Sequence, residues 1–168
     1  MTLHNVIPEH LSTLLGTLRS SGVEIQSSHD IIKIHAKKKL YSIDPLQTAP
    51  FPGFPTDLQA QIMSYLATVE GTSILTETVF EGRLKHVDEL NRLGAHIAVD
   101  LNTAFIRGVE CLTGSEVEAT DLRAGAALVI AGLAARGTTT VKQIHYIDRG
   151  YQNLEEMLSL LGADIKRV

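Results

Sequence analysis

The sequence predicts an α+β fold built from a repeated helix–strand–helix–strand–strand unit. Internal repeats mark repeated structural units, and three short motifs recur here in one order and at nearly constant separation. They are Thr56-Asp57-Leu58 with Thr120-Asp121-Leu122, Gly71-Thr72 with Gly137-Thr138, and Leu93-Gly94-Ala95 with Leu161-Gly162-Ala163. The segments between the motifs alternate between helical and strand-like hydrophobic patterns, which gives the order of elements within each unit.

Residues 1–50 form the first unit, which lacks the helix that opens the other two. A strand is expected over residues 3–6, a helix over about 8–21, and a hairpin from 23–25 and 31–35. The motif Ser21-Gly22-Val23 ends the helix as a weaker copy of the later Leu-Gly-Ala motif. We therefore expect one incomplete domain over residues 1–168, in which one buried helix is missing.

The middle unit, residues 51–115, opens with a helix. Thr56 and Gln59 form a capping-box pattern, which predicts a helix from Thr56 to about Glu70. Gly71 is then expected to end it in a left-handed conformation.

The rest of the middle unit alternates strands with one short helix. Residues 72–80 alternate and are rich in β-prone side chains, so they are expected to form a strand with Phe80 packed inward. A short amphipathic helix should run over 87–93, and a hairpin over 97–106 around Asp100-Leu101-Asn102.

The third unit, residues 116–168, repeats this order. Its expected elements are a helix at 121–136, a strand at 138–146, a helix at 154–161 and a strand at 163–168. The first helix has no charge between Ala124 and Ala135, and a helix that is apolar on every face is expected to be buried. Its inward side, with that of the 56–70 helix, should include Leu58, Ile62, Leu66, Leu122, Leu128 and Leu133. With one helix missing, we expect part of this core to be open and the chain to self-associate.

Composition excludes several classes of function. The 168 residues carry a net charge of −4 with mixed signs and no basic tract, which argues against nucleic acid as a partner. No segment resembles a signal peptide or reaches the roughly 20 apolar residues that span a bilayer, so a cytoplasmic protein is expected. Cys111 is the only cysteine, and the seven histidines show no ligand spacing, so neither an internal disulfide nor a metal site is expected.

Four longer segments resemble the C-terminal part of UDP-N-acetylglucosamine enolpyruvyl transferases, also called 1-carboxyvinyltransferases. They are residues 54–61 (FPTDLQAQ), 76–81 (TETVFE), 119–124 (ATDLRA) and 147–151 (IDRGY). The resemblance implies an inside-out α/β barrel built from three units. The whole enzyme would consist of two such barrels, with the active site between them. It also implies transfer of enolpyruvyl from phosphoenolpyruvate to the 3-hydroxyl of UDP-N-acetylglucosamine in peptidoglycan synthesis, with no cofactor.

The resemblance assigns a catalytic role to Asp57. It places this carboxylate against the sugar 3-hydroxyl as the proposed base, with Thr56 beside it in the substrate-binding set. The alternative is a carboxylate with no catalytic role that only interacts favourably with the dipole at a helix N-terminus. Val79 would meet the nucleotide sugar through its backbone, and Phe80 adjoins it.

The resemblance also assigns Arg149 to a phosphoenolpyruvate contact, with Arg83 and Arg123 lining the same cleft. Guanidinium groups bind carboxylate and phosphate with paired donors. The alternatives are surface arginines or salt-bridge partners of nearby acids. Asp121 matches a carboxylate near the active site, although helix capping explains it nearly as well.

Two functions of different classes follow. In the first, the chain is the C-terminal part of the transferase, and it is inactive alone because the N-terminal half, with its reactive cysteine, is absent. Cys111 matches no catalytic motif and does not replace that residue. In the second, the chain is a stand-alone, non-catalytic homologue that serves in binding or assembly. The presence of Asp57, Arg83, Arg123 and Arg149 favours the first.

Overall fold

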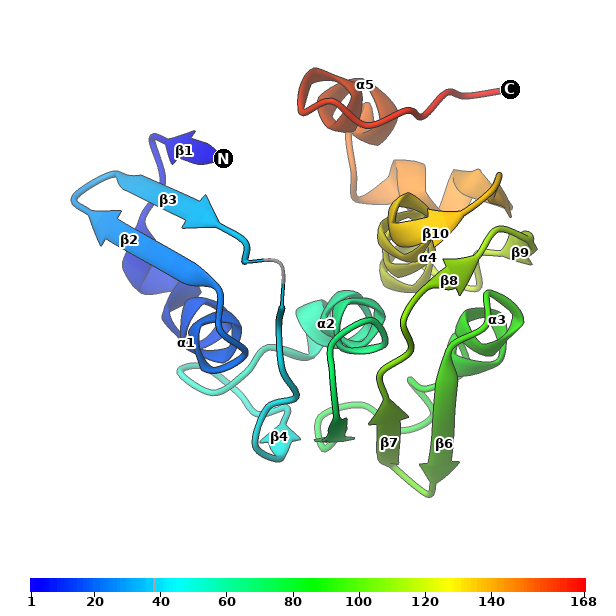
Figure 1. Cartoon of the computed structure of the whole chain (residues 1–168), viewed down its shortest axis with the longest axis horizontal. Helices are drawn as coiled ribbons and strands as arrows, with labels where there is room; N and C mark the ends of the chain where they lie inside the picture. The colour runs from blue at the N-terminus through cyan, green and yellow to red at the C-terminus, as the bar shows by residue number, and fades with distance from the viewer. Residues whose placement is uncertain (38) are drawn as a thin grey trace.

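The computed structural model describes residues 1–37 and 39–168. Its N-terminal part is a three-stranded antiparallel sheet, ordered β1-β3-β2, with α1 packed beside β2 (Figure 1). The elements are β1 (Thr2–His4), the 3-10 helix η1 (Pro8–Leu11), α1 (Ser12–Ser20), β2 (Glu24–Ser28) and β3 (Ile31–His35). The strand, helix and hairpin predicted for the first unit are all present.

The middle of the chain is a four-stranded sheet, ordered β4-β5-β7-β6, which lies below α2 in the view of Figure 1. Strand β4 runs parallel to β5, and the other pairs are antiparallel. The elements are β4 (Leu46–Gln47), η2 (Thr56–Leu58), α2 (Gln59–Leu66), β5 (Thr72–Thr76), α3 (Val87–Arg92), β6 (His96–Asp100) and β7 (Thr103–Arg107). The hairpin turns at Leu101, whose φ of 54° is left-handed, as the predicted Asp-Leu-Asn turn requires.

The last part of the chain surrounds one long helix, α4, with short strand pairs. Strand β10 pairs in parallel with β8, and β11 with β9. The elements are β8 (Leu112–Thr113), β9 (Glu116–Glu118), α4 (Leu122–Ala134), β10 (Ala135–Arg136), β11 (Thr140–Lys142), η3 (Ile144–Arg149) and α5 (Leu154–Leu160). In Figure 1, α5 and the C-terminal tail lie at the top, away from the main sheet.

The core is one buried cluster to which α2, α4 and the four-stranded sheet contribute, with α2 packed against α4 and against β7. Leu66 of α2 and Leu128 of α4 are fully buried, and the Ser64 hydroxyl donates to the Ala127 carbonyl across the helix pair at 2.8 Å. On its other side α4 packs on η3, and this contact depends on Gly125. A Cβ there would lie 2.5 Å from the Ile147 side chain.

Several predicted elements are shorter than expected. The helix expected to reach Glu70 ends at Leu66, because Glu70 pairs instead with the chain before it: its N–H donates to Leu40 and its carbonyl accepts from Ser42. Gly71 has a positive φ of +106°, but it lies beyond the end of the helix and does not cap it, contrary to prediction. The strand expected over 72–80 stops at Thr76, where side-chain contacts described below replace the ladder.

The third unit departs furthest from prediction. Of the strand expected over 138–146, only β11 forms; its ladder with β9 is three residues long, and left-handed Gln143 then turns the chain into η3. Residues 163–168 form no strand, and their Arg167 is held by ion pairs instead.

Helix α4 is not buried on every side, contrary to prediction. Residues 124–128 and Ala131 are buried, but Ile130 and Leu133 are 38% and 43% exposed, so the expected inward position of Leu133 is wrong. The chain after α4 packs on the helix at Gly125, through Ile147, and at Gly132, through Thr139, and leaves Ile130 and Leu133 partly uncovered by the described residues. Within residues 1–37 and 39–168, no helix is both long enough and apolar enough to cross a membrane.

Candidate active site

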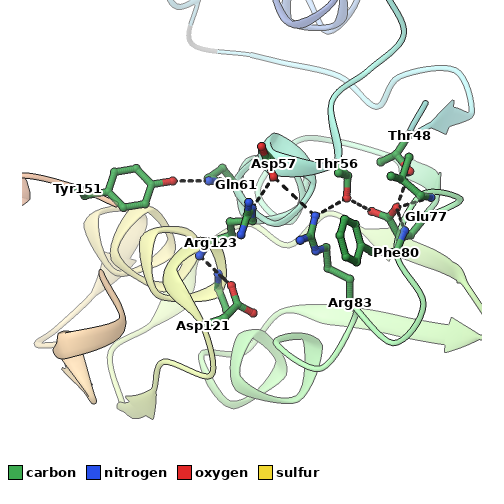
Figure 2. Close-up of polar contacts among 12 residues, drawn as sticks. Thr48, Thr56, Asp57, Gln61, Glu77, Phe80, Arg83, Asp121, Arg123 and Tyr151 are labelled. Atoms are coloured by element: carbon green, nitrogen blue, oxygen red, sulfur yellow. Dashed lines mark hydrogen bonds and ion pairs between the residues drawn. The ribbon is translucent and has the colours of Figure 1, made fainter. Parts of the chain in front are cut away.

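Three predicted site residues meet at the N-terminal ends of α2 and α4 (Figure 2). Asp57 lies in η2, Arg83 in the loop after β5, and Arg123 in the first turn of α4. The Arg123 Nε donates to Asp57 Oδ1 at 2.6 Å, and Arg83 Nη1 lies 3.7 Å from the same oxygen. The Asp57 side chain is 64% exposed while both arginines are mostly covered, so one accessible carboxylate is bracketed by two fixed cations.

Behind this cluster lies a buried carboxylate, Glu77, which is 2% exposed. Its Oε2 accepts from the Thr56 hydroxyl at 2.8 Å. Its Oε1 accepts from the Thr48 hydroxyl at 2.8 Å and from the backbone N–H groups of Val79 and Phe80 at 2.8 and 3.0 Å. A buried charge is tolerated only when it is paired or fully hydrogen-bonded, and four donors meet that requirement.

These donors also decide the protonation state of Glu77. Burial alone would raise the pKa of its carboxyl, but the Thr56 hydroxyl, the two backbone N–H groups and the Thr48 hydroxyl together hold it below its ordinary value. Glu77 is therefore a carboxylate at neutral pH.

Thr56 does not close the predicted capping box. No side-chain cap forms at η2 or α2, and Gln59 is buried with neither end of its amide paired within the protein. The Thr56 hydroxyl instead donates to Glu77 and accepts from Arg83 Nη1 at 2.7 Å. A cap would need the Thr56 oxygen to accept from a backbone N–H, but it accepts from the charged Arg83 guanidinium, which is the stronger donor.

The loop after β5 presents Val79 and Phe80 to solvent. They are 40% and 55% exposed, so the expectation that Phe80 packs inward is wrong. Because Glu77 bonds both backbone N–H groups, the chain leaves the sheet here and turns both side chains outward. The Arg83 guanidinium then stacks over the Phe80 ring at 4.1 Å, a cation–π contact.

Asp121 caps α4. Its carboxylate accepts from the N–H groups of Arg123 and Ala124 at 2.8 and 3.1 Å, so the capping role predicted as its alternative is present. The cap fixes the first turn of α4, and therefore the point from which Arg123 reaches Asp57.

His86 is a second buried ionisable group in this region, and its Nε2 has no partner within the described protein. Burial lowers the pKa of His86 to about 4, against the opposing influence of the Asp121 carboxylate and of the Arg83 backbone. The imidazole is therefore neutral at physiological pH.

Arg149 lies apart from the hydrogen-bonded cluster, at the end of η3. It is exposed, stacks 5.5 Å from the Tyr146 ring, and lines an open groove of about 640 Å³ with Asp148 and Arg167. Tyr151, which also lines the groove, joins it to α2: its hydroxyl accepts from Gln61 Nε2 at 2.8 Å.

Sequence reasoning gave Glu77 no role, although a signal was present. Ser73, Leu75 and Glu77 occupy alternate positions and all point inward. A carboxylate on the buried face of a strand requires dedicated donors, and three of the four come from residues 56, 79 and 80, which lie in or beside the motifs already singled out.

Among the residues that the structure describes, no three histidine, cysteine or acidic side chains are grouped so that they could hold a metal ion. Cys111 is a free thiol that donates to the Leu112 carbonyl at 3.0 Å, with no base beside it in the described contacts. The cluster is thus a site of carboxylate and guanidinium groups, suited to binding an anion beside a group that donates a proton.

Known proteins resemble the chain over nearly its whole length. The pattern of the EPSP synthase (3-phosphoshikimate 1-carboxyvinyltransferase) family matches residues 1–158. A UDP-N-acetylglucosamine 1-carboxyvinyltransferase of Desulfofundulus thermocisternus is 52% identical over 167 residues, 99% of this chain and 68% of that protein. UDP-N-acetylglucosamine 1-carboxyvinyltransferase 2 of Carboxydothermus hydrogenoformans is 55% identical over 99% of this chain but 40% of its own length. The chain therefore spans about two thirds of the first relative and two fifths of the second.

Solved structures agree. The enolpyruvyl transferase NikO from Streptomyces tendae matches 93% of this chain and 36% of its own, with a TM-score of 0.84 and 33% identity. EPSP synthase from Acinetobacter baumannii shares the fold, with a TM-score of 0.73 and 19% identity over 99% of this chain. The α+β arrangement and the predicted resemblance are thereby confirmed, while closure into a barrel is not seen in the chain itself. The chain belongs to the EPSP synthase family of carboxyvinyltransferases, as a homologue of UDP-N-acetylglucosamine 1-carboxyvinyltransferase that covers part of the length of its relatives.

Proposed function

We propose that this chain is the C-terminal part of a UDP-N-acetylglucosamine 1-carboxyvinyltransferase, which moves enolpyruvyl from phosphoenolpyruvate to the sugar 3-hydroxyl in peptidoglycan synthesis. The observation that carries the proposal is the exposed Asp57 carboxylate bracketed by Arg83 and Arg123. The names of the relatives that are about half identical to it support the choice of substrates.

Each group then has a role in an addition followed by an elimination. Asp57 takes the proton of the sugar 3-hydroxyl as the hydroxyl oxygen bonds to C2 of phosphoenolpyruvate. The C2–C3 double bond opens in this step, and C3 takes up a proton from solvent. Loss of phosphate and of a proton from C3 restores the double bond. Arg83, Arg123 and Arg149 bind the carboxylate and phosphate charges, because preorganised cations stabilise charge where it sits and develops. Thr56, Val79 and Phe80 line the sugar side, and Asp121 holds the turn that carries Arg123.

The rest of the enzyme has to supply the other half of this site. We propose that units 1–50, 51–115 and 116–168 form most of one inside-out barrel, and that a cytoplasmic N-terminal half completes the cleft. The isolated chain is then inactive and binds UDP-N-acetylglucosamine only weakly. We also propose that the open face at Ile130 and Leu133 lets isolated chains self-associate, which light scattering would detect as a mass above that of one chain.

A chimera tests the function directly. This chain replaces the matching segment of the Carboxydothermus hydrogenoformans relative, and phosphate release is measured with both substrates. We expect turnover in the chimera and none in the isolated chain. Asp57→Ala should lower kcat far more than it raises the KM for the sugar, since the base acts in the transition state.

Arg149→Lys in the same chimera keeps the charge but loses the paired donors, so it should raise the KM for phosphoenolpyruvate or lower turnover. A folded chimera that binds the sugar without turnover would overturn the proposal and favour the non-catalytic binding or assembly module. Submicromolar sugar binding by the isolated chain would contradict the half-site.

A further inference from the structure

Glu77 is the one acidic side chain buried in the described residues, and the proposed chemistry does not use it. We infer that Glu77 is a positioning residue, which orients the Arg83 guanidinium through the Thr56 hydroxyl and separately holds the loop of Val79 and Phe80. The inference rests on the proposed function only where it assigns Arg83 to phosphoenolpyruvate and the loop to the sugar. The hydrogen-bond geometry itself does not depend on that function.

The two oxygens of Glu77 serve different parts of the site (Figure 2). Oε2 accepts from Thr56 at 2.8 Å, and Thr56 in turn accepts from Arg83 at 2.7 Å. Oε1 accepts from the N–H groups of Val79 and Phe80 and from the Thr48 hydroxyl, whose own oxygen accepts from the Thr78 N–H at 2.9 Å. One oxygen is connected to the Arg83 side and the other to the loop.

The charge on Glu77 fixes the direction of these hydrogen bonds. A carboxylate only accepts, and a hydroxyl has a single proton to donate. The Thr56 hydroxyl therefore donates its proton to Oε2, and its lone pairs remain free to accept from Arg83, which only donates. Arg83 is held at 2.7 Å from Thr56, 3.7 Å from Asp57 and 4.1 Å from the Phe80 ring, so the orientation of one cation depends on a carboxylate it does not touch.

Replacing the carboxylate by an amide separates the two branches. In Glu77→Gln the amide oxygen is expected at the Oε1 position, because the two backbone N–H groups there can only donate. The amide nitrogen then occupies the Oε2 position and donates to Thr56. The Thr56 oxygen must now accept from both Gln and Arg83, and its own proton has no acceptor. The N–H groups of Val79 and Phe80 therefore keep their acceptor. The hydrogen bond between residue 77 and Thr56 is reversed, so Thr56 no longer donates toward residue 77.

The first experiment measures the KM for each of the two substrates in the chimera described above. Glu77→Gln should raise the KM for phosphoenolpyruvate about tenfold or more, because it disturbs a hydrogen bond to a charged group, and should leave the KM for the sugar within about twofold. A residue with a merely structural role would shift both constants together or neither. Glu70→Gln is the matched control, since it removes an exposed carboxylate that pairs with Lys39, and it should leave both constants near those of the parent.

A double-mutant cycle tests the route through Thr56. Thr56→Val removes the hydroxyl and should reproduce the effect of Glu77→Gln on the KM for phosphoenolpyruvate. The double variant Glu77→Gln/Thr56→Val should be no worse than Thr56→Val alone, because both changes break one relay. Additive effects, or equal shifts in both KM values, would overturn the inference.

A second measurement does not depend on activity. In the isolated chain, the side-chain NMR signals of Arg83 should show hindered rotation of the guanidinium, and Glu77→Gln should relieve it while Glu70→Gln should not. If the parent chimera is inactive, the proposed function fails and this measurement still decides the positioning role. Rotation of Arg83 that is unchanged by Glu77→Gln would overturn that role.

Discussion

The region around α2 and the region after α4 both carry candidate site residues, but different interactions hold them in place. Asp57, Arg83 and Arg123 sit on a closed core in which α2, α4 and the four-stranded sheet bury their apolar side chains. Between Gly132 and Val168 only Ile147 is buried, and α5 has no buried residue. The first region is fixed by packing, and the second by short strand pairs and exposed ion pairs.

The difference matters for Arg149, which lies in the second region. Its neighbours are tied together by Arg167, which bridges Asp148 at 2.7 and 3.1 Å and Glu155 at 3.0 and 3.3 Å. Arg167 lowers the pKa of both acids, so all three groups are charged at neutral pH. Exposed pairs of this kind contribute little to stability. The groove with Arg149 should therefore be more mobile than the cluster at Asp57.

The largest expected effect on stability comes from truncating a side chain in the packed region. Leu128 is fully buried between α4 and α2, and Leu128→Ala should lower the free energy of unfolding by about 2–5 kcal/mol, as large cavities in cores do. Leu160→Ala removes the same atoms from a side chain that is 88% exposed, and should change the free energy of unfolding by less than about 0.5 kcal/mol. Urea unfolding of both variants gives the comparison, and equal losses would contradict it.

The pH dependence of stability should also come from the packed region. The unfolded chain protonates His86 below its ordinary pKa of about 6.5, whereas the folded chain resists until about pH 4. The unfolded state thus binds more protons in this window, and stability falls as pH drops from about 6.5 to 4, by about 3 kcal/mol. Glu77 acts in the same direction, since its stabilisation is lost as pH falls through its lowered pKa.

Urea midpoints at pH 7, 5.5 and 4 measure this dependence. His86→Gln should flatten the curve over that range, whatever it does to stability at pH 7. His96→Gln changes an exposed imidazole and should retain the parent slope. A His86→Gln curve parallel to the parent would place the acid sensitivity elsewhere in the molecule.

A small effect on global stability is expected at Arg167. Arg167→Gln should change the free energy of unfolding by less than about 1 kcal/mol, because the pairs it removes are exposed. Amide hydrogen exchange in α5 should nevertheless become faster, since few other contacts hold that helix. Lys142→Gln, which breaks the exposed pair with Glu116, is the control and should leave α5 unchanged. Unchanged exchange in α5 of Arg167→Gln would show that the tail is held by something other than these ion pairs.

The sequence by itself determined the local elements and the identity of the family. Repeated motifs, hairpin turns and helical spacing depend on a residue and its near neighbours, so the first unit, the 97–106 hairpin and the positions of α2, α3 and α4 could be predicted. The resemblance singled out Asp57 for the sugar and placed Arg83 and Arg123 in one cleft with Arg149. The structure brings Asp57, Arg83 and Arg123 together, and the roles of all four residues stay predictions.

Tertiary structure alone decided which partner each polar group takes. Thr56 was predicted to cap a helix, but a carboxylate 21 residues later in the chain captures its hydroxyl, and the same carboxylate ends β5 and turns Phe80 outward. Likewise, the lack of charge in α4 predicted burial on all sides, yet Ile130 and Leu133 remain exposed because burial requires a neighbour on each face. Periodicity records what a segment is able to bury or bond, whereas competition among distant groups for the same donors and surfaces settles what it does.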